Sequence, residues 1–191
     1  MKQTAIDYKN IYYPPGGILM WIIIFLELIT FGMALIAFAY FGHQEPEIFH
    51  QSKLQLNPTM GAVNTVFLLT SGFFIANAVH FYKIGNIKIT KRFFKLAMLG
   101  GLLFLLLKSF EYYAKIIAGI TIDTNTFFTF YWMLTGFHII HVLMGLVILL
   151  MTHRSISKGK SELEDVEAAA TFWHMCDLIW LLLFPILYLI F

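Results

Sequence analysis

The sequence predicts an all-α membrane protein, a polytopic bundle of five transmembrane helices. Hydrophobic residues make up 59% of the 191 residues and charged residues only 13%, a composition unlike that of water-soluble domains. The apolar residues gather in five blocks of roughly 20 residues or more, the length that crosses a lipid bilayer. Such blocks must be helical, because an isolated strand cannot pair its backbone groups in lipid.

The predicted spans follow one another in a single domain, residues 1–191. They cover residues 17–41, 59–81, 93–113, 127–151 and 168–191. Turn-forming segments separate them: GHQEPE and LNP in the first loop, KIGN in the second, and ITIDTN in the third. The fourth loop, THRSISKGKSELEDVEAAA, is basic at its start and acidic at its end. The N-terminal segment lacks the short apolar core of a cleavable signal peptide, so we expect the first span to be retained.

The basic residues predict the orientation of the bundle. The N-terminus and the second and fourth loops carry Lys2, Lys9, Lys83, Lys88, Lys91, Arg92, Lys95, Arg154, Lys158 and Lys160. The opposite side carries Lys53 and Lys115. Because cytoplasmic loops are enriched in Lys and Arg, we expect the N-terminus in the cytoplasm and the C-terminus outside.

Ionisable residues inside the spans are candidate functional residues, because each is costly in hydrocarbon unless it faces protein or water. They are Glu27, His80, Lys108, Glu111, His138, His141, His174 and Asp177. Three pairs share a helix face through a spacing of three residues: Lys108 with Glu111, His138 with His141, and His174 with Asp177.

The depths of these residues predict one buried polar layer. A rise of about 1.5 Å per residue puts Glu27 roughly 15 Å from the cytoplasmic boundary. Its expected members are Glu27, His138, His141, His174 and Asp177, whose hydrogen bonds would fix the helix register. Support of proton uptake is a second hypothesis for the same layer, because imidazole titrates near neutrality. Lys108 and Glu111 lie nearer the opposite face, where a local ion pair or snorkelling would accommodate them.

Small residues and tryptophans on the spans are expected to serve helix packing. They are Gly72, Thr135, Gly136, Gly145, Trp173 and Trp180. The single cysteine, Cys176, excludes an internal disulfide and a tetrathiolate cluster, and no basic stripe indicates nucleic acid.

Three other kinds of site have weaker support in these residues. Haem needs histidines that face one another across the bundle at matched depth, and two such pairs are not evident. A di-metal carboxylate site needs repeated Glu-x-x-His pairs, which the sequence lacks. A transporter typically shows inverted repeats and broken helices, and neither is visible. We therefore expect no catalytic residue and no metal site in this chain.

The polar residues of the spans lie in segments that resemble, in order, subunit III of heme-copper oxidases. The segments are LELITFGMALIAF, LNPTMGAVNTVFLLTSGFFIANAVH, LKSFEYY, FFTFYWMLTGFHIIHVLMGLVI and AAATFWHMCDLIWLLLFPILY. The similarity covers nearly the whole chain and implies the five-helix form of that subunit, which begins at the third helix of the seven-helix form. Five-helix subunits of quinol oxidases and an accessory protein of nitric oxide reductase are similar too.

The resemblance implies a non-catalytic subunit of a proton-pumping respiratory oxidase in a bacterial inner membrane. Such a subunit packs on subunit I and other oxidase subunits, stabilises subunit I during oxygen reduction and supports proton uptake, while haem and copper belong to the catalytic partner. The matching positions are Glu27, His80, Glu111, His138, His141, His174 and Asp177. The alternatives are an accessory subunit of nitric oxide reductase and a haem-carrying electron-transfer subunit.

Two departures limit what the resemblance implies. Lys108 stands where the family often has glutamine, so its partner is undetermined. The two helices that this chain lacks wall part of the family's lipid cleft, which leaves phospholipid binding unsettled. The electron donor, cytochrome c or quinol, is undetermined as well.

Overall fold

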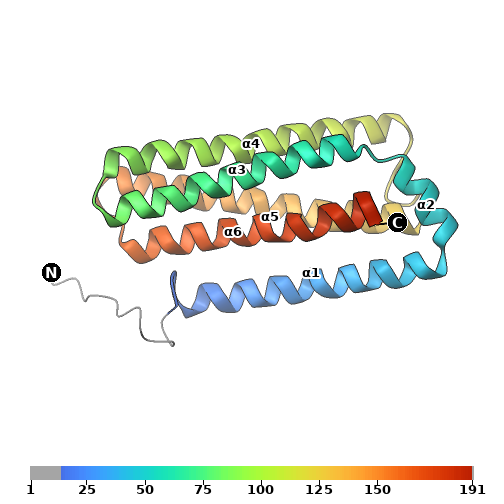
Figure 1. Cartoon of the computed structure of the whole chain (residues 1–191), viewed down its shortest axis with the longest axis horizontal. Helices are drawn as coiled ribbons and strands as arrows, with labels where there is room; N and C mark the ends of the chain where they lie inside the picture. Colours follow the sequence, from blue (N-terminus) through green and yellow to red (C-terminus); the bar gives the residue numbers. More distant parts are fainter. Residues whose placement is uncertain (1–13, 191) are drawn as a thin grey trace.

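The computed structural model describes residues 14–190, and these residues form helices and no strand. The elements are α1 (Ile18–Gln44), α2 (Pro46–Leu54), α3 (Pro58–Lys83), α4 (Ile87–Ile117), α5 (Thr126–Ser157), α6 (Leu163–Pro185) and a closing π-helical segment, η1 (Ile186–Ile190). Figure 1 shows the long helices side by side, with α2 across one end of the bundle. The predicted all-α class is confirmed. Lys2, Lys9 and Phe191 lie outside the described residues.

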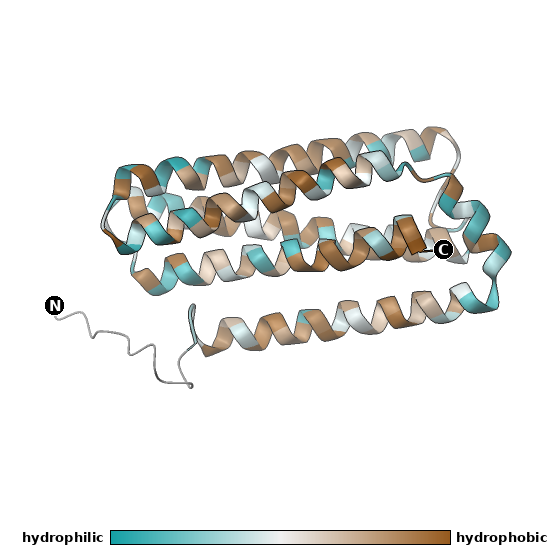
Figure 2. Ribbon diagram, viewed as in Figure 1, coloured by the Kyte–Doolittle hydropathy of each residue, from teal (hydrophilic) through white to brown (hydrophobic). Residues whose placement is uncertain are grey.

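Within residues 14–190, five helices are long and apolar enough to cross a membrane: α1, α3, α4, α5, and α6 continued by η1. Figure 2 shows hydrophobic residues along the length of these helices and hydrophilic ones gathered mainly toward their ends. Helices that are apolar on every side are typical of membrane spans. The chain is therefore a multi-pass membrane protein, as the sequence predicts, and its orientation stays a prediction.

Asparagines in the predicted loops start three of the spans. The Asn57 side chain accepts hydrogen bonds from the backbone N–H groups of Thr59 and Met60, at 3.0 and 3.2 Å. Asn86 and Asn125 cap α4 and α5 in the same way. These side chains satisfy N–H groups that have no partner within the first turn of a helix. The turn residues recognised in the sequence are thus helix caps as well.

Helix α6 packs against both α3 and α5, and Trp173 contacts both of these helices. The Trp173 indole N–H donates to the Ser71 hydroxyl at 3.0 Å, and Ser71 in turn donates to the Ala97 carbonyl oxygen at 2.7 Å. This chain of hydrogen bonds joins α6, α3 and α4. A Cβ atom added at Gly145 would approach the Trp173 ring to 2.8 Å, so the glycine leaves room for the indole. Close approach at small residues is the usual means of packing membrane helices.

Candidate functional site

The buried pair Lys108–Glu111 forms the centre of a polar cluster between α4, α5 and η1. Lys108 is fully buried and Glu111 is 3% exposed. The Lys108 Nζ atom lies 2.9 Å from Glu111 Oε2, one turn along the same helix. The local ion pair expected from the sequence is confirmed. Snorkelling is wrong for Lys108, because its ammonium group is enclosed rather than directed to a membrane surface.

Two tyrosines complete this cluster. Lys108 Nζ donates to the hydroxyl oxygens of Tyr131 and Tyr188 at 3.1 and 2.7 Å. The same hydroxyls donate to Glu111 Oε1 at 2.8 and 2.6 Å. An ammonium group has three hydrogens, and each has an acceptor here. Lys108 thus pairs with the Glu111 carboxylate and with the two tyrosine hydroxyls.

Sequence reasoning missed both tyrosines. Tyr131 lies on α5. Tyr188 lies in η1, the segment that follows Pro185. A proline cannot donate a backbone hydrogen bond, and a π-helical turn changes the rotation of the residues that follow. An α-helical reading of the sequence therefore could not place the Tyr188 hydroxyl beside a charge on α4.

A second contact joins α1 to α5. Glu27 Oε2 lies 3.1 Å from His141 Nε2, with 24% and 11% of the two side chains exposed. His141 Nδ1 lies 2.9 Å from the carbonyl oxygen of Phe137. A carbonyl oxygen only accepts hydrogen bonds, so Nδ1 carries a hydrogen and Nε2 is the nitrogen that faces Glu27. A favourable contact with Glu27 then needs one proton, held by the carboxyl group or by Nε2.

The third polar contact lies within α6. His174 Nδ1 is 3.6 Å from Asp177 Oδ2. Asp177 is nearly buried, whereas 46% of the His174 side chain is exposed. The Asp177 Oδ1 atom is buried and has no hydrogen-bond partner among residues 14–190. Gly72 of α3 faces this pair, because a Cβ atom there would clash with the Asp177 carboxylate.

His138 is buried among rings rather than hydrogen bonded. Its side chain stacks on Trp180 with 5.4 Å between ring centroids, and Phe104 meets it edge-on at 5.6 Å. Neither ring nitrogen has a hydrogen-bond partner in the described part of the chain. The expectation that hydrogen bonds tie His138 into the layer is therefore not met, because aromatic side chains occupy the space around the ring.

The five residues of the expected layer thus fall into two pairs and one separate ring. Glu27 meets His141 across two helices, and His174 meets Asp177 within one helix. Cys176 connects their surroundings, since its sulfur lies 3.6 Å from the His141 carbonyl oxygen. The common layer, as a functional unit, stays a prediction.

The remaining predicted positions have simpler surroundings. His80 is exposed near the end of α3 and contacts the Phe81 ring at 5.4 Å. Thr135 donates to the Tyr131 carbonyl oxygen at 2.6 Å and accepts from the Tyr112 hydroxyl at 2.6 Å, which links α5 to α4. A Cβ atom at Gly136 would meet only Tyr112, at 3.9 Å.

An apolar groove of about 500 Å³ lies between α1 and α5. Phe31 and Ala34 line it from α1, and Gly136 and Ile140 line it from α5. Within residues 14–190, no three His, Cys, Asp or Glu side chains are grouped so that they could hold a metal ion. The ring nitrogens of His138 are covered by the packing of these residues.

Comparison with known proteins decides the family. Residues 13–190 match the family model described as Cytochrome c oxidase subunit III. The chain belongs to this subunit III family. The resemblance noted in the sequence is confirmed, and it covers all five spans.

Individual relatives within the family differ in length. A heme-copper oxidase subunit I+III from Aeropyrum pernix is 27% identical over 180 residues, which are 90% of this chain and 22% of that protein. A probable cytochrome c oxidase subunit 3 from Mycobacterium leprae is 30% identical over 139 residues, 71% of this chain and 69% of the relative. Cytochrome c oxidase subunit 3 from Oryctolagus cuniculus is 34% identical over 137 residues, 70% of this chain and 51% of the relative. The chain thus spans about half the length of this animal relative.

Proposed function

We propose that this chain is the non-catalytic subunit III of a proton-pumping respiratory heme-copper oxidase, and that it packs on subunit I and stabilises it. The observation that carries the proposal is the family match over nearly the whole chain. A relative whose name combines subunits I and III in one polypeptide supports the contact with subunit I. Haem and copper belong to the catalytic partner, where oxygen is reduced. The complex lies in a bacterial inner membrane with the N-terminus of this chain in the cytoplasm.

Support of proton uptake is assigned to the Glu27–His141 pair. The pair needs one proton for its contact, it links two helices, and both side chains keep some exposure. A group that can pass its proton between a carboxyl oxygen and a ring nitrogen suits the buffering of protons near a membrane channel. Its role is to hold a proton, whereas electron transfer belongs to the partner.

Phospholipid is assigned to the groove between α1 and α5. Its lining is almost wholly apolar, and it opens between two membrane-spanning helices. A lipid acyl chain fits such a surface through dispersion contacts. Both α1 and α5 supply the residues that line this groove.

Purification of the tagged chain from its native membrane tests the proposal. We expect subunit I of a heme-copper oxidase to co-purify in equal amount, together with the haem absorption bands of that complex. The isolated chain, stripped from its partners, should show no haem absorption. The proposal fails if the chain purifies alone, if a nitric oxide reductase accompanies it, or if haem stays on the isolated chain.

A further inference from the structure

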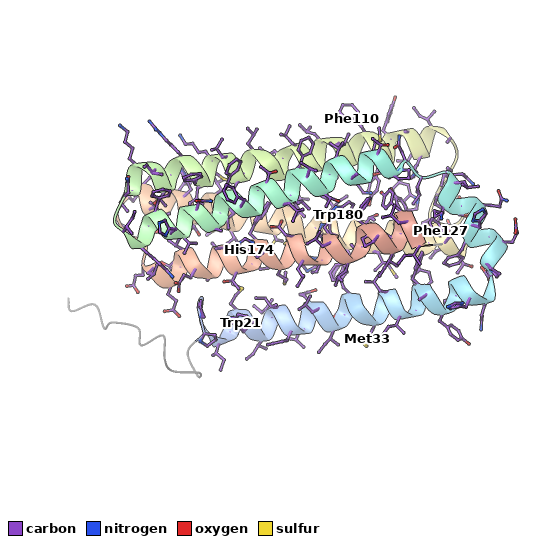
Figure 3. The ribbon with its side chains drawn as sticks, in the orientation of Figure 1. Trp21, Met33, Phe110, Phe127, His174 and Trp180 are labelled. Carbon is purple, nitrogen blue, oxygen red and sulfur yellow. The ribbon has the colours of Figure 1, made fainter. Side chains whose placement is uncertain are left out.

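One ionisable side chain in the middle of a span is turned outward. Among the ionisable side chains of residues 14–190, His174 alone is both exposed and more than ten residues from either end of its helix. It lies six residues after residue 168, where the predicted membrane span begins, which is roughly 9 Å along the helix axis. Figure 3 labels it on α6, some distance along the helix from Trp180.

Lipid is a poor neighbour for this imidazole. A histidine side chain is too short to reach the headgroup region from that depth, so snorkelling cannot relieve it. Nδ1 faces Asp177, and residues 14–190 offer the other ring nitrogen, Nε2, no hydrogen bond. In hydrocarbon a polar nitrogen without a hydrogen-bond partner is energetically unfavourable.

Other outward polar groups in the spans do not have this problem. The exposed hydroxyls of Thr30, Thr70 and Ser109 each donate to a carbonyl oxygen four residues earlier in their own helix, at 2.7–2.9 Å. Such groups are satisfied locally and tolerate lipid. The His174 ring is therefore a distinguishing feature of the α6 surface.

The neighbours of His174 on α6 form a continuous stripe. Leu178 and Leu181 follow at spacings of four and seven residues, on the same helix face. Their exposed fractions are 44% and 39%. Behind the stripe, Asp177 and Gly72 lie against the imidazole. The buried Asp177 Oδ1 atom has no hydrogen-bond partner among residues 14–190. The surface thus combines an apolar ridge with one polar group that needs a partner from outside.

We propose that this stripe, His174, Leu178 and Leu181, is the surface through which the chain docks on subunit I. A transmembrane helix of subunit I packs along the leucines and presents a hydroxyl, amide or carboxyl group to His174 Nε2. Buried hydrogen bonds of this kind specify which helix faces meet in a membrane. The inference rests on the proposed function, since it takes subunit I as the partner.

Photo-cross-linking in the intact complex tests the surface. A benzophenone amino acid is placed at Leu178, and in separate variants at Met33 of α1 and Phe110 of α4. These control residues are 60% and 65% exposed, and Figure 3 shows them on the outer sides of the bundle. We expect the Leu178 variant alone to cross-link to subunit I. The inference is overturned if Leu178 gives no cross-link to subunit I, or if Met33 or Phe110 gives one as strong.

The two proposals fail in different ways. If subunit I co-purifies but cross-links elsewhere, only the docking surface is wrong. If subunit I is absent from the purified material, the proposed function fails first.

A substitution tests the polar contact itself. His174→Leu should make the chain dissociate from the detergent-solubilised complex about tenfold faster, equivalent to about 1.4 kcal/mol. His174→Gln keeps a donor and an acceptor and should restore most of the retention. Thr70→Val is the control, because the Thr70 hydroxyl is bonded within its own helix. If the His174→Leu chain stays in the complex as long as the parent chain does, the proposed contact is wrong.

Discussion

Glu27 of α1 and His141 of α5 lie with a carboxyl oxygen 3.1 Å from a ring nitrogen, a contact that is favourable when a proton lies between the two atoms. The contact is the polar link between α1 and the rest of the bundle in the described residues, where α1 otherwise packs through apolar side chains such as Phe31. A helix that is attached mainly by apolar contacts has little to fix its register in lipid. The pair therefore has a structural role as well as the proposed role in proton uptake.

Replacing Glu27 separates these two roles. Glu27→Gln can still donate a hydrogen bond to His141 Nε2, so assembly with subunit I should be kept. It cannot take up or release a proton, so activity should be lost faster during turnover than in the parent complex. Turnover in proteoliposomes, followed with a pH indicator, measures both effects. Unchanged proton uptake and unchanged inactivation would leave the pair with only its structural role.

Removing the Lys108 charge should destabilise the bundle strongly. Lys108→Met leaves Glu111 buried beside two hydroxyls without a cation, and breaking a buried ion pair typically costs about 3–5 kcal/mol. The double variant Lys108→Gln with Glu111→Gln removes both charges and should recover much of that loss. Equilibrium unfolding in mixed detergent micelles, monitored by circular dichroism, gives the free energies. If Lys108→Met unfolds at the same denaturant concentration as the parent chain, the ion pair does not stabilise the bundle.

A single hydroxyl group should have a smaller effect. Tyr188→Phe removes one hydrogen bond to Glu111 and one acceptor for Lys108. We expect a loss of about 1–3 kcal/mol in the free energy of unfolding, because the charged groups keep their other partners. Tyr113→Phe is the matched control, since Tyr113 is 66% exposed on α4. The same unfolding measurement should show no change for the control, and equal losses in both variants would contradict the assignment.

Alanine substitutions at two glycines of α5 should have different effects on stability. Gly145→Ala brings a methyl group against the Trp173 ring and should cost about 1–3 kcal/mol by overpacking. Gly136→Ala meets only the Tyr112 hydroxyl at van der Waals distance and should be neutral or slightly stabilising. Thermal unfolding of the two variants side by side distinguishes them. If the ranking is reversed, the packing of α6 against α5 differs from that described.

The sequence was sufficient for the fold because apolar blocks of membrane length allow only one backbone solution. The helices extend beyond the predicted spans at several ends; α4, for example, begins at Ile87 rather than at residue 93. The hydrophobic signal stops where lipid ends, whereas backbone hydrogen bonding and caps such as Asn86 continue the helix. Composition therefore locates the membrane segment of a helix better than its ends.

The polar residues were harder to arrange. Depth along each helix correctly indicated that Glu27 and His141 could meet, but it does not specify the rotation of a helix about its axis. His138 shows the consequence, because it has a suitable depth and yet contacts Trp180 and Phe104. Tyr188 shows the converse, since a proline followed by a π-helical segment brings it to a charge that no spacing rule connects with it.

Removal and restoration of this chain in the purified oxidase test whether the chain supports a catalytic partner without carrying out the reaction itself. The complex is depleted of the chain with detergent, and oxygen consumption is followed through many turnovers before and after the chain is added back. We expect an unchanged initial rate, a faster loss of activity in the depleted complex, and recovery of the parent time course on addition. An initial rate that falls to zero together with loss of haem, or a time course that is unaffected by depletion, would contradict it.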